Sequence, residues 1–235
     1  LEKAKNQFEQ VKGMMECFYE KMGPYPFEED GFKLVETPYL GMEHQSAVAY
    51  GNEYENGYLG SDLSGTGIGL KWDYIIIHES GHEWYGNSIT ASDIADMWIQ
   101  EGFTSYTEAI YVECQWGKQA AQEYLEGTRR SVSNFSSIIG DYGVNAEGSG
   151  DMYFKGANLL NTIRSIYNDD ELWWKTFKDY TETYRHQTIS TKDTETFFDK
   201  ATQVDLSPIF DQYLRNSALP ELQLKEENDK IYYRW

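Results

Sequence analysis

Two histidines and a glutamate near the middle of the chain have the residue types and the spacing of a metal site. The segment HESGH at 78–82 is followed by Glu101. Residues four apart on a helix lie one turn apart on the same face, so the imidazoles of His78 and His82 can bind one ion. Zinc held by two histidines and a carboxylate keeps a fourth position for water, whose pKa falls toward about 7. The spacing predicts one catalytic zinc ion (Zn2+) per chain, with Glu79 as the base that takes the proton of that water.

A chance coincidence and a structural zinc site are the two alternatives to a catalytic site in this block. Coincidence on an ordinary buried helix is disfavoured by the scarcity of histidine, because two of only four histidines fall here. Structural zinc sites are typically closed sets of four ligands rich in cysteine, and neither Cys17 nor Cys114 is near the block. Both alternatives therefore have less support than the catalytic site.

The segment that carries the histidines has the pattern of a buried helix. Residues 72–77 (WDYIII) are largely apolar and lead into His78 without a glycine or a proline. Gly86-Asn87 is typical of the left-handed residues that end a helix. We therefore expect a helix that ends at Gly86 and presents both imidazoles on one face.

A second helix is predicted from about Ile94 to Gln115, after a loop at residues 88–93. Glu101 and Glu108 lie two turns apart on this helix and share a face. Glu101 can therefore reach the metal. Metal-bound imidazoles usually donate their second N–H to a carboxylate or a carbonyl, so Glu108 is expected to accept that hydrogen bond behind one of the ligands.

Composition excludes some classes of partner. With 39 acidic and 20 basic residues the formal net charge is -19, which argues against nucleic acid and against an anionic membrane surface and favours cationic substrates. No apolar run reaches the roughly 20 residues needed to span a bilayer, so a soluble fragment is expected, whose native localisation the sequence does not reveal. Cys17 and Cys114 have no repeated spacing and are predicted to be buried free thiols.

The rest of the chain predicts an α+β fold. Residues 2–19 have helical apolar spacing, residues 32–37 and 42–50 read as strands, and most of 72–216 reads as helix. The glycine-rich stretch 65–71 lacks a phosphate-loop pattern and is expected to be a surface loop.

Three further segments carry local signals. A capping box is expected at 168–171, and Ser207-Pro208 reads as a cap followed by a first-turn proline. Tyr153 follows a glycine-rich break and stands at the start of a helix. Residues 221–224 and 231–235 alternate like strands. They predict a boundary between a catalytic domain at 1–220 and the start of a truncated β domain at 221–235.

Four blocks together resemble the gluzincin aminopeptidases, which include alanyl aminopeptidase, aminopeptidase N and the leukotriene-processing hydrolase. Residues 78–87 (HESGHEWYGN) are similar to the zinc helix of that family, and residues 98–104 (WIQEGFT) to its Trp-Leu-Asn-Glu-Gly-Phe-Ala block. Residues 40–44 (LGMEH) resemble its Gly-x-Met-Glu-Asn strand, and residues 153–157 (YFKGA) the segment with its catalytic tyrosine. The resemblance covers nearly the whole chain.

The resemblance implies a role for each matching residue. The zinc ligands are expected to be His78, His82 and Glu101. Glu79 is implied as the general base and Tyr153 as the hydroxyl that stabilises the transition state. The strand residues expected to bind the substrate are Gly41, Met42 and Glu43, the last of them through the free amine. The implied fold is a thermolysin-like catalytic domain, with a small mixed sheet lobe, then a mostly helical lobe, and the zinc helix between them.

The implied activity is hydrolysis of the first peptide bond of peptides with a free amino terminus. His44 and Leu40 depart from the family pattern in the substrate-binding strand. Family enzymes also carry domains before and after the catalytic lobe, so this segment alone is expected to bind zinc with weak or no aminopeptidase activity. A thermolysin-like endopeptidase and a zinc-binding but inactive interaction module remain as alternatives.

Overall fold

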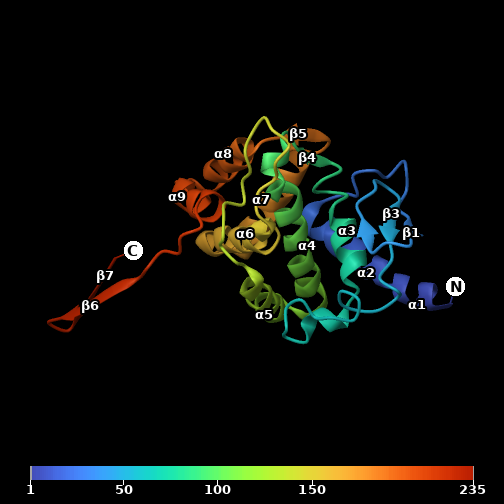
Figure 1. The fold of residues 1–235 in the computed structure, drawn as a ribbon, viewed down its shortest axis with the longest axis horizontal. Coiled ribbons are helices and arrows are strands. Elements are labelled where there is room, and N and C mark those ends of the chain that lie inside the picture. Colours follow the sequence, from blue (N-terminus) through green and yellow to red (C-terminus); the bar gives the residue numbers. More distant parts are fainter. Residues whose placement is uncertain (1, 235) are drawn as a thin grey trace.

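A small three-stranded sheet and a larger group of helices form the structure, a computed structural model that describes residues 2–234. Figure 1 shows the sheet on one side, helices α8 (Thr191–Thr202) and α9 (Ser207–Phe210) on the other, and helices α3 (Tyr74–Gly81) and α4 (Trp98–Trp116) between them. This arrangement confirms the predicted α+β class. Within the described residues no helix is long and apolar enough to cross a membrane.

The chain begins with two helices, α1 (Glu2–Phe8) and α2 (Gln10–Met22). The sequence predicted a single helix that ended near Tyr19. Helix α2 continues to Met22 and stops at Gly23, whose φ of 100° is accessible to glycine. The buried face of α2 consists of Met14, Cys17, Phe18 and Met22, and it packs against α4 and α7.

The sheet has the strand order β1-β3-β2, with β1 (Leu34–Glu36), β2 (Gly41–Met42) and β3 (Val48–Tyr50). Strand β1 is parallel to β3, and β2 is antiparallel to it. The continuous strand predicted at 42–50 is wrong, because the chain turns back between β2 and β3. Ser46 takes a left-handed φ of 59° in this turn, which ends the extended conformation.

Helix α3 (Tyr74–Gly81) carries the first histidine and is buried along its whole length. Asp73 caps it by accepting hydrogen bonds from the backbone N–H groups of Ile75 and Ile76. The same carboxylate accepts a 2.6 Å bond from the hydroxyl of Tyr50, so the start of α3 is attached to the sheet. A short 3-10 helix, η1 (Ile68–Lys71), precedes it.

Helix α3 ends earlier than the sequence predicted. Its last residue is Gly81, and the chain continues through turns to Gly86. His82 nevertheless keeps helical dihedrals, with φ -62° and ψ -20°, so the one-turn spacing from His78 is preserved.

Helix α4 (Trp98–Trp116) runs through the centre of the molecule (Figure 1), with buried residues from Trp98 to Val112. The single helix predicted from Ile94 is divided into η2 (Ile94–Asp96) and α4. The loop predicted at 88–93 contains strand β4 (Ile89–Ala91), which pairs in parallel with β5 (Gln187–Ile189).

The remaining helices pack around α4. They are α5 (Lys118–Thr128), η3 (Arg129–Ser131), η4 (Gly150–Met152), α6 (Phe154–Tyr167), α7 (Asp170–Thr183), α8 (Thr191–Thr202), α9 (Ser207–Phe210) and the π-helical η5 (Asp211–Arg215). Stacked aromatic rings fill the space between them; Phe103 and Tyr180, for example, have ring centroids 4.9 Å apart.

Two predicted caps differ in detail. Asp169 caps α7 through the N–H of Leu172, whereas the reciprocal capping box occurs at Ser190 in α8. The predicted cap Ser207 is instead the first residue of α9, because Leu206 occupies the capping position.

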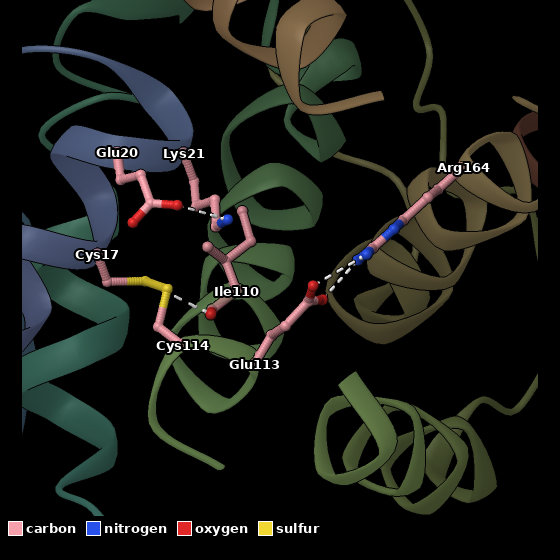
Figure 2. The surroundings of a disulfide bond; sticks show 7 residues. All are labelled: Cys17, Glu20, Lys21, Ile110, Glu113, Cys114 and Arg164. Carbon is pink, nitrogen blue, oxygen red and sulfur yellow. Dashed lines mark hydrogen bonds and ion pairs between the residues drawn. A yellow bond between two sulfur atoms is a disulfide. The ribbon is translucent and has the colours of Figure 1, made fainter. Parts of the chain in front are cut away.

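The prediction that both cysteines are free is wrong. Cys17 of α2 and Cys114 of α4 form a disulfide with Cα atoms 6.0 Å apart (Figure 2). Their separation of 97 residues hides the pair in the sequence, because only the packing of α2 on α4 brings the two side chains together. Beyond the bridge Glu113 binds Arg164 of α6 through two hydrogen bonds of 2.6 and 2.9 Å, so side chains from three helices meet near the end of α4.

The last described residues form a hairpin of β6 (Gln223–Glu227) and β7 (Lys230–Arg234). It extends away from the helices (Figure 1), and every residue in both strands is exposed. The strand predicted at 231–235 agrees with β7 as far as Arg234, and Trp235 lies outside the described residues.

Candidate functional site

Helices α3 and α4 bring the three predicted metal ligands together. The Oε2 atom of Glu101 lies 3.6 Å from Nε2 of His78 and 3.3 Å from Nε2 of His82. One ligand atom from each residue falls within 4.8 Å of the others. The two histidine side chains are 5% and 1% exposed and that of Glu101 is 12% exposed, so the ligand atoms converge in a largely dry position.

The chemistry of these groups fits zinc. Within the described chain the buried Oε2 atom of Glu101 has no hydrogen-bond partner, although a buried carboxylate oxygen without one is costly. It faces two imidazole nitrogens, and two histidines with one carboxylate form a common zinc ligand set. A cation bound by these three atoms would compensate the charge of Glu101.

The other nitrogen of each imidazole is held by a protein group. Nδ1 of His78 lies 2.7 Å from Oε1 of Glu108, whose other oxygen accepts a 2.7 Å bond from Tyr124. Nδ1 of His82 lies 2.9 Å from the carbonyl oxygen of Tyr85. Acceptors at Nδ1 favour the tautomer that leaves Nε2 free to bind a metal.

Charge interactions among the protein groups agree with this arrangement. Burial opposes the charged form of His78 and lowers its pKa, but the nearby carboxylates of Glu101 and Glu108 outweigh burial and raise the pKa well above its usual value. Burial would likewise raise the pKa of Glu101, but the two histidines lower it strongly. Glu101 is therefore held as a carboxylate, the form that binds a metal.

Glu79 lies beside the metal ligands and close to Glu43, the residue predicted to bind the amine of the substrate. Ligand atoms of Glu43, Glu79 and His82 lie within 4.8 Å of one another. Burial raises the pKa of Glu79, the nearby histidines lower it, and the carboxylates Glu43 and Glu101 raise it again, with a net upward shift. A raised pKa makes a carboxylate better able to accept a proton near neutral pH.

Strand β2 lies directly on α3 at Gly41. A Cβ atom at this position would lie 2.8 Å from Oε1 of Glu79 and 2.9 Å from Cγ2 of Ile75, so only glycine permits the strand to approach this closely. The next residue, Met42, is 42% exposed, and Glu43 follows it, half-buried, in the turn. The predicted substrate strand therefore lies beside the predicted base.

Tyr153 approaches the site from the start of α6. Its ring stacks on that of His78 with centroids 6.1 Å apart. A close contact between backbones allows this: a Cβ atom on Gly156 of α6 would lie 2.8 Å from Cα of Gly102 on α4. Burial raises the pKa of Tyr153, as does Glu101, so its hydroxyl keeps its proton and can donate a hydrogen bond.

Sequence reasoning missed several groups that support the site. Tyr124 holds Glu108, and Thr104 places its hydroxyl 3.1 Å from Nδ1 of His82. Glu83 and Asn87, which follow the second histidine, contact the turn that follows β2. Their place within the histidine block was the only sequence signal, and it did not show what they bind.

Comparisons with known proteins agree with the geometry. Residues 6–213 match the peptidase family M1 domain. The chain is 23% identical over 230 residues to probable aminopeptidase 1 of Sulfurisphaera tokodaii, covering 92% of this chain and 29% of that protein. It is 28% identical over 181 residues to aminopeptidase N of Canis lupus familiaris, covering 70% of this chain and 18% of that protein. The chain thus spans less than a third of either relative.

Solved structures share the fold. Native leukotriene A4 hydrolase from Saccharomyces cerevisiae superimposes with a TM-score of 0.76 at 17% identity, covering 94% of this chain and 37% of that chain. An M1 zinc metallopeptidase from Deinococcus radiodurans gives a TM-score of 0.70 at 20% identity, covering 90% and 45%. At these identities the likeness concerns the fold alone.

Proposed function

The chain belongs to peptidase family M1, and on this premise we propose that the protein is a zinc aminopeptidase that removes the first residue of peptides with a free amino terminus. The observation that carries the proposal is the convergence of His78, His82 and Glu101 beside Glu79, which in turn lies against Gly41. The matched relatives named as aminopeptidases support it.

The residues proposed to hold one zinc ion are His78, His82 and Glu101. When bound, zinc lowers the pKa of a coordinated water toward about 7 and polarises the carbonyl of the scissile bond. Glu108 and the carbonyl oxygen of Tyr85 keep the two imidazoles in the required orientation. The protein thus presents the ligand atoms already arranged, which limits the reorganisation needed to bind the metal.

Glu79 acts as the general base. It takes the proton from the attacking water and later delivers a proton to the departing amine. Its raised pKa suits both steps, because a group that exchanges protons near neutral pH must hold neither form too strongly. Its 9% exposure limits contact with bulk water, which would otherwise screen its charge.

Tyr153 stabilises the transition state. Attack on a peptide carbonyl places negative charge on the carbonyl oxygen, and a phenol hydroxyl aimed at that oxygen binds it more strongly as charge develops. Since burial keeps the hydroxyl protonated, Tyr153 is available as a donor. Its position at the start of α6, beside His78, is suitable for this role.

Glu43 binds the free amine of the substrate. A carboxylate makes a charge-assisted hydrogen bond to an ammonium group, and Glu43 lies beside Glu79 and His82. Gly41 and Met42 form the strand along which the first residue of the substrate is expected to lie. Only one substrate residue would then fit between Glu43, which binds the amine, and the metal site, so the enzyme would be an exopeptidase.

We further propose that residues 1–220 form the catalytic domain and that residues 221–235, which include the hairpin of β6 and β7, begin a following β domain. Support comes from the exposed hairpin, which has no buried residue among those described, and from the greater length of the relatives. If other domains complete the amine site, the segment alone should bind zinc yet show weak or no aminopeptidase activity.

The test is Glu79→Gln in the full-length protein. Loss of the base should lower kcat for an aminoacyl anilide by at least about 1,000-fold, while metal analysis should still find one zinc per chain. Glu123→Gln, at an exposed position on α5, is the matched control and should leave kcat unchanged. Undiminished hydrolysis by Glu79→Gln would remove this residue from the mechanism, and cleavage of N-acetylated peptides at internal bonds at equal rates would favour the endopeptidase.

A further inference from the structure

The residues that follow the second histidine contact the turn that carries Glu43. We refer to residues 43–46 as the Glu43 turn. Two side chains, those of Glu83 and Asn87, cross from the end of the histidine segment to this turn. Their side-chain hydrogen bonds go to Tyr25 and to this turn, and neither residue belongs to the groups of possible metal ligands, so the zinc site does not account for their presence.

Glu83 holds the end of the Glu43 turn at Ser46. It is fully buried, and its Oε1 atom accepts a 2.7 Å hydrogen bond from the backbone N–H of Ser46. Its Oε2 atom accepts a 2.9 Å bond from the hydroxyl of Tyr25, which also lies 3.2 Å from the hydroxyl of Ser46. A buried carboxylate is costly unless it is hydrogen-bonded. Here the bonds hold Ser46 in its left-handed conformation, which a non-glycine residue rarely adopts.

Asn87 holds the start of the Glu43 turn at the backbone of Glu43. Its side-chain Nδ2 donates a 2.8 Å hydrogen bond to the backbone carbonyl of Glu43. Its backbone N–H donates a 2.9 Å bond to the carbonyl of His82. A single residue thus connects a metal ligand to the residue that faces the amine, through two hydrogen bonds.

The sheet gives the turn little other support. Pairing between β2 and β3 covers two residue pairs and ends at Met42, one residue before Glu43. The backbone of Glu43 is therefore held at its carbonyl by Asn87, and three residues later at Ser46 by Glu83. These contacts set the position of the Glu43 backbone relative to the end of the histidine segment.

We propose that Glu83 and Asn87 are positioning residues that hold Glu43 at the distance from the zinc ligands that a free α-amine requires. This inference rests on the proposed function, since it assigns the control of amine recognition within the same site. A displacement of about 1 Å at a reacting group can cost about 100-fold in rate. Loosening the turn should therefore weaken the recognition of the amine and leave the metal site intact.

Two zinc-binding inhibitors separate amine recognition from metal binding. L-Leucine hydroxamate carries a free amine, whereas 4-methylpentanohydroxamate has the same skeleton without it. Their inhibition constants are measured on the full-length protein and on its Asn87→Ala and Glu83→Ala variants, together with zinc content. We expect the constant for L-leucine hydroxamate to rise about tenfold, with little change for the desamino compound and in zinc content.

Two further variants test whether the effect is specific. Glu83→Gln keeps an oxygen that can accept from Ser46, so it should restore values near those of the unmodified protein. Ser88→Ala, at the residue after Asn87, removes the hydroxyl oxygen that accepts a hydrogen bond from the backbone N–H of His186, on another part of the fold. It should leave the ratio of the two inhibition constants unchanged.

The outcomes are distinguishable. If both inhibitors weaken together in Asn87→Ala and Glu83→Ala, or if neither weakens, the positioning role is wrong. If the unmodified protein does not prefer the inhibitor with the amine, both the amine-reading role of Glu43 and this inference fail. The zinc hydrolase itself is tested separately by Glu79→Gln, whose result does not depend on the Glu43 turn.

Discussion

The metal-ligand region and the Glu43 turn face each other but are built differently. The ligands lie on α3, at the residue that caps its C-terminus and on α4, and each histidine is buried and has a partner at its second nitrogen. The Glu43 turn follows a strand of two residues, contains Ser46 at a positive φ and leaves Met42 42% exposed. Under the proposed function, the reaction chemistry would lie in the core and the recognition of the substrate end on a peripheral segment.

This difference has a physical reason. Metal ligands must hold three atoms in a fixed geometry, which packed helices with buried hydrogen bonds supply. A substrate strand must instead leave its backbone accessible to a peptide, so it cannot be buried in the same way. Contacts from the end of the histidine segment compensate, because they attach the accessible strand to the rigid region.

After the loss of the base Glu79, the largest expected effect is on zinc affinity, in the metal-ligand region. Replacing Glu108 by Gln removes the charge behind His78 while keeping an oxygen that can accept from Nδ1. Loss of such an outer partner typically costs 10–100-fold in metal affinity. We expect a zinc dissociation constant higher by about that factor, measured by competition with a chromophoric chelator.

The control for this prediction is Asn87→Ala, which affects the Glu43 turn. Once saturated with zinc, Glu108→Gln should keep the ratio of inhibition constants for the two hydroxamates, whereas Asn87→Ala should change that ratio and keep the zinc affinity. Unaltered zinc affinity in Glu108→Gln would show that the carboxylate does not support the ligand. If each variant changed both quantities, the two regions would not be separable.

The same division explains what the sequence could predict. The ligand set depends on a one-turn spacing and on a short separation between two helices, and the structure brings His78, His82 and Glu101 together. Short-range patterns also predicted the start of α6 at Tyr153 and the buried character of α3. These features depend on residues close together in the chain.

Features that depend on distant contacts could not be predicted. The pairing of Cys17 with Cys114 and of β4 with β5 requires the packing of whole helices. The break within the strand predicted at 42–50 depends on Glu83, which holds Ser46 in an unusual conformation. No local pattern encodes a hydrogen bond from a residue 37 positions away.

The disulfide is expected to stabilise the fold and to have little effect on the site. The bridge closes a separation of 97 residues between α2 and α4, and such a loop restricts the unfolded chain enough to stabilise a protein by about 2–4 kcal/mol. Cys114→Ser should lower the free energy of unfolding by that amount and keep the ratio of hydroxamate constants. The free energy of unfolding is measured by denaturant titration. Reduction with dithiothreitol should lower that of the unmodified protein to the value of the variant. An unmodified protein that is indifferent to the reductant would contradict this expectation.

The smallest effect concerns Asp170, the first residue of α7. Its carboxylate binds Arg164 at 3.0 Å and Lys118 at 2.7 Å, and these cations lower its pKa from 3.8 to about 2. A depressed folded pKa contributes stability that is present above the unfolded value and is lost as the pH falls through the folded value. The side chain is 43% exposed, so solvent screening should keep the contribution below about 1 kcal/mol.

Unfolding of the unmodified protein and of Asp170→Asn should therefore differ by a constant small amount above about pH 5, and the two curves should converge between about pH 4 and pH 2. Arg164 keeps its two bonds to Glu113 in the variant, so no buried charge is left unpaired and the loss stays small. Asp179→Asn, which breaks only an exposed pair with Lys175, is the control for the loss of an exposed ion pair. If the difference in the free energy of unfolding instead grew as the pH fell, the carboxylate would destabilise the fold. Its interaction with Arg164 and Lys118 would then be unfavourable.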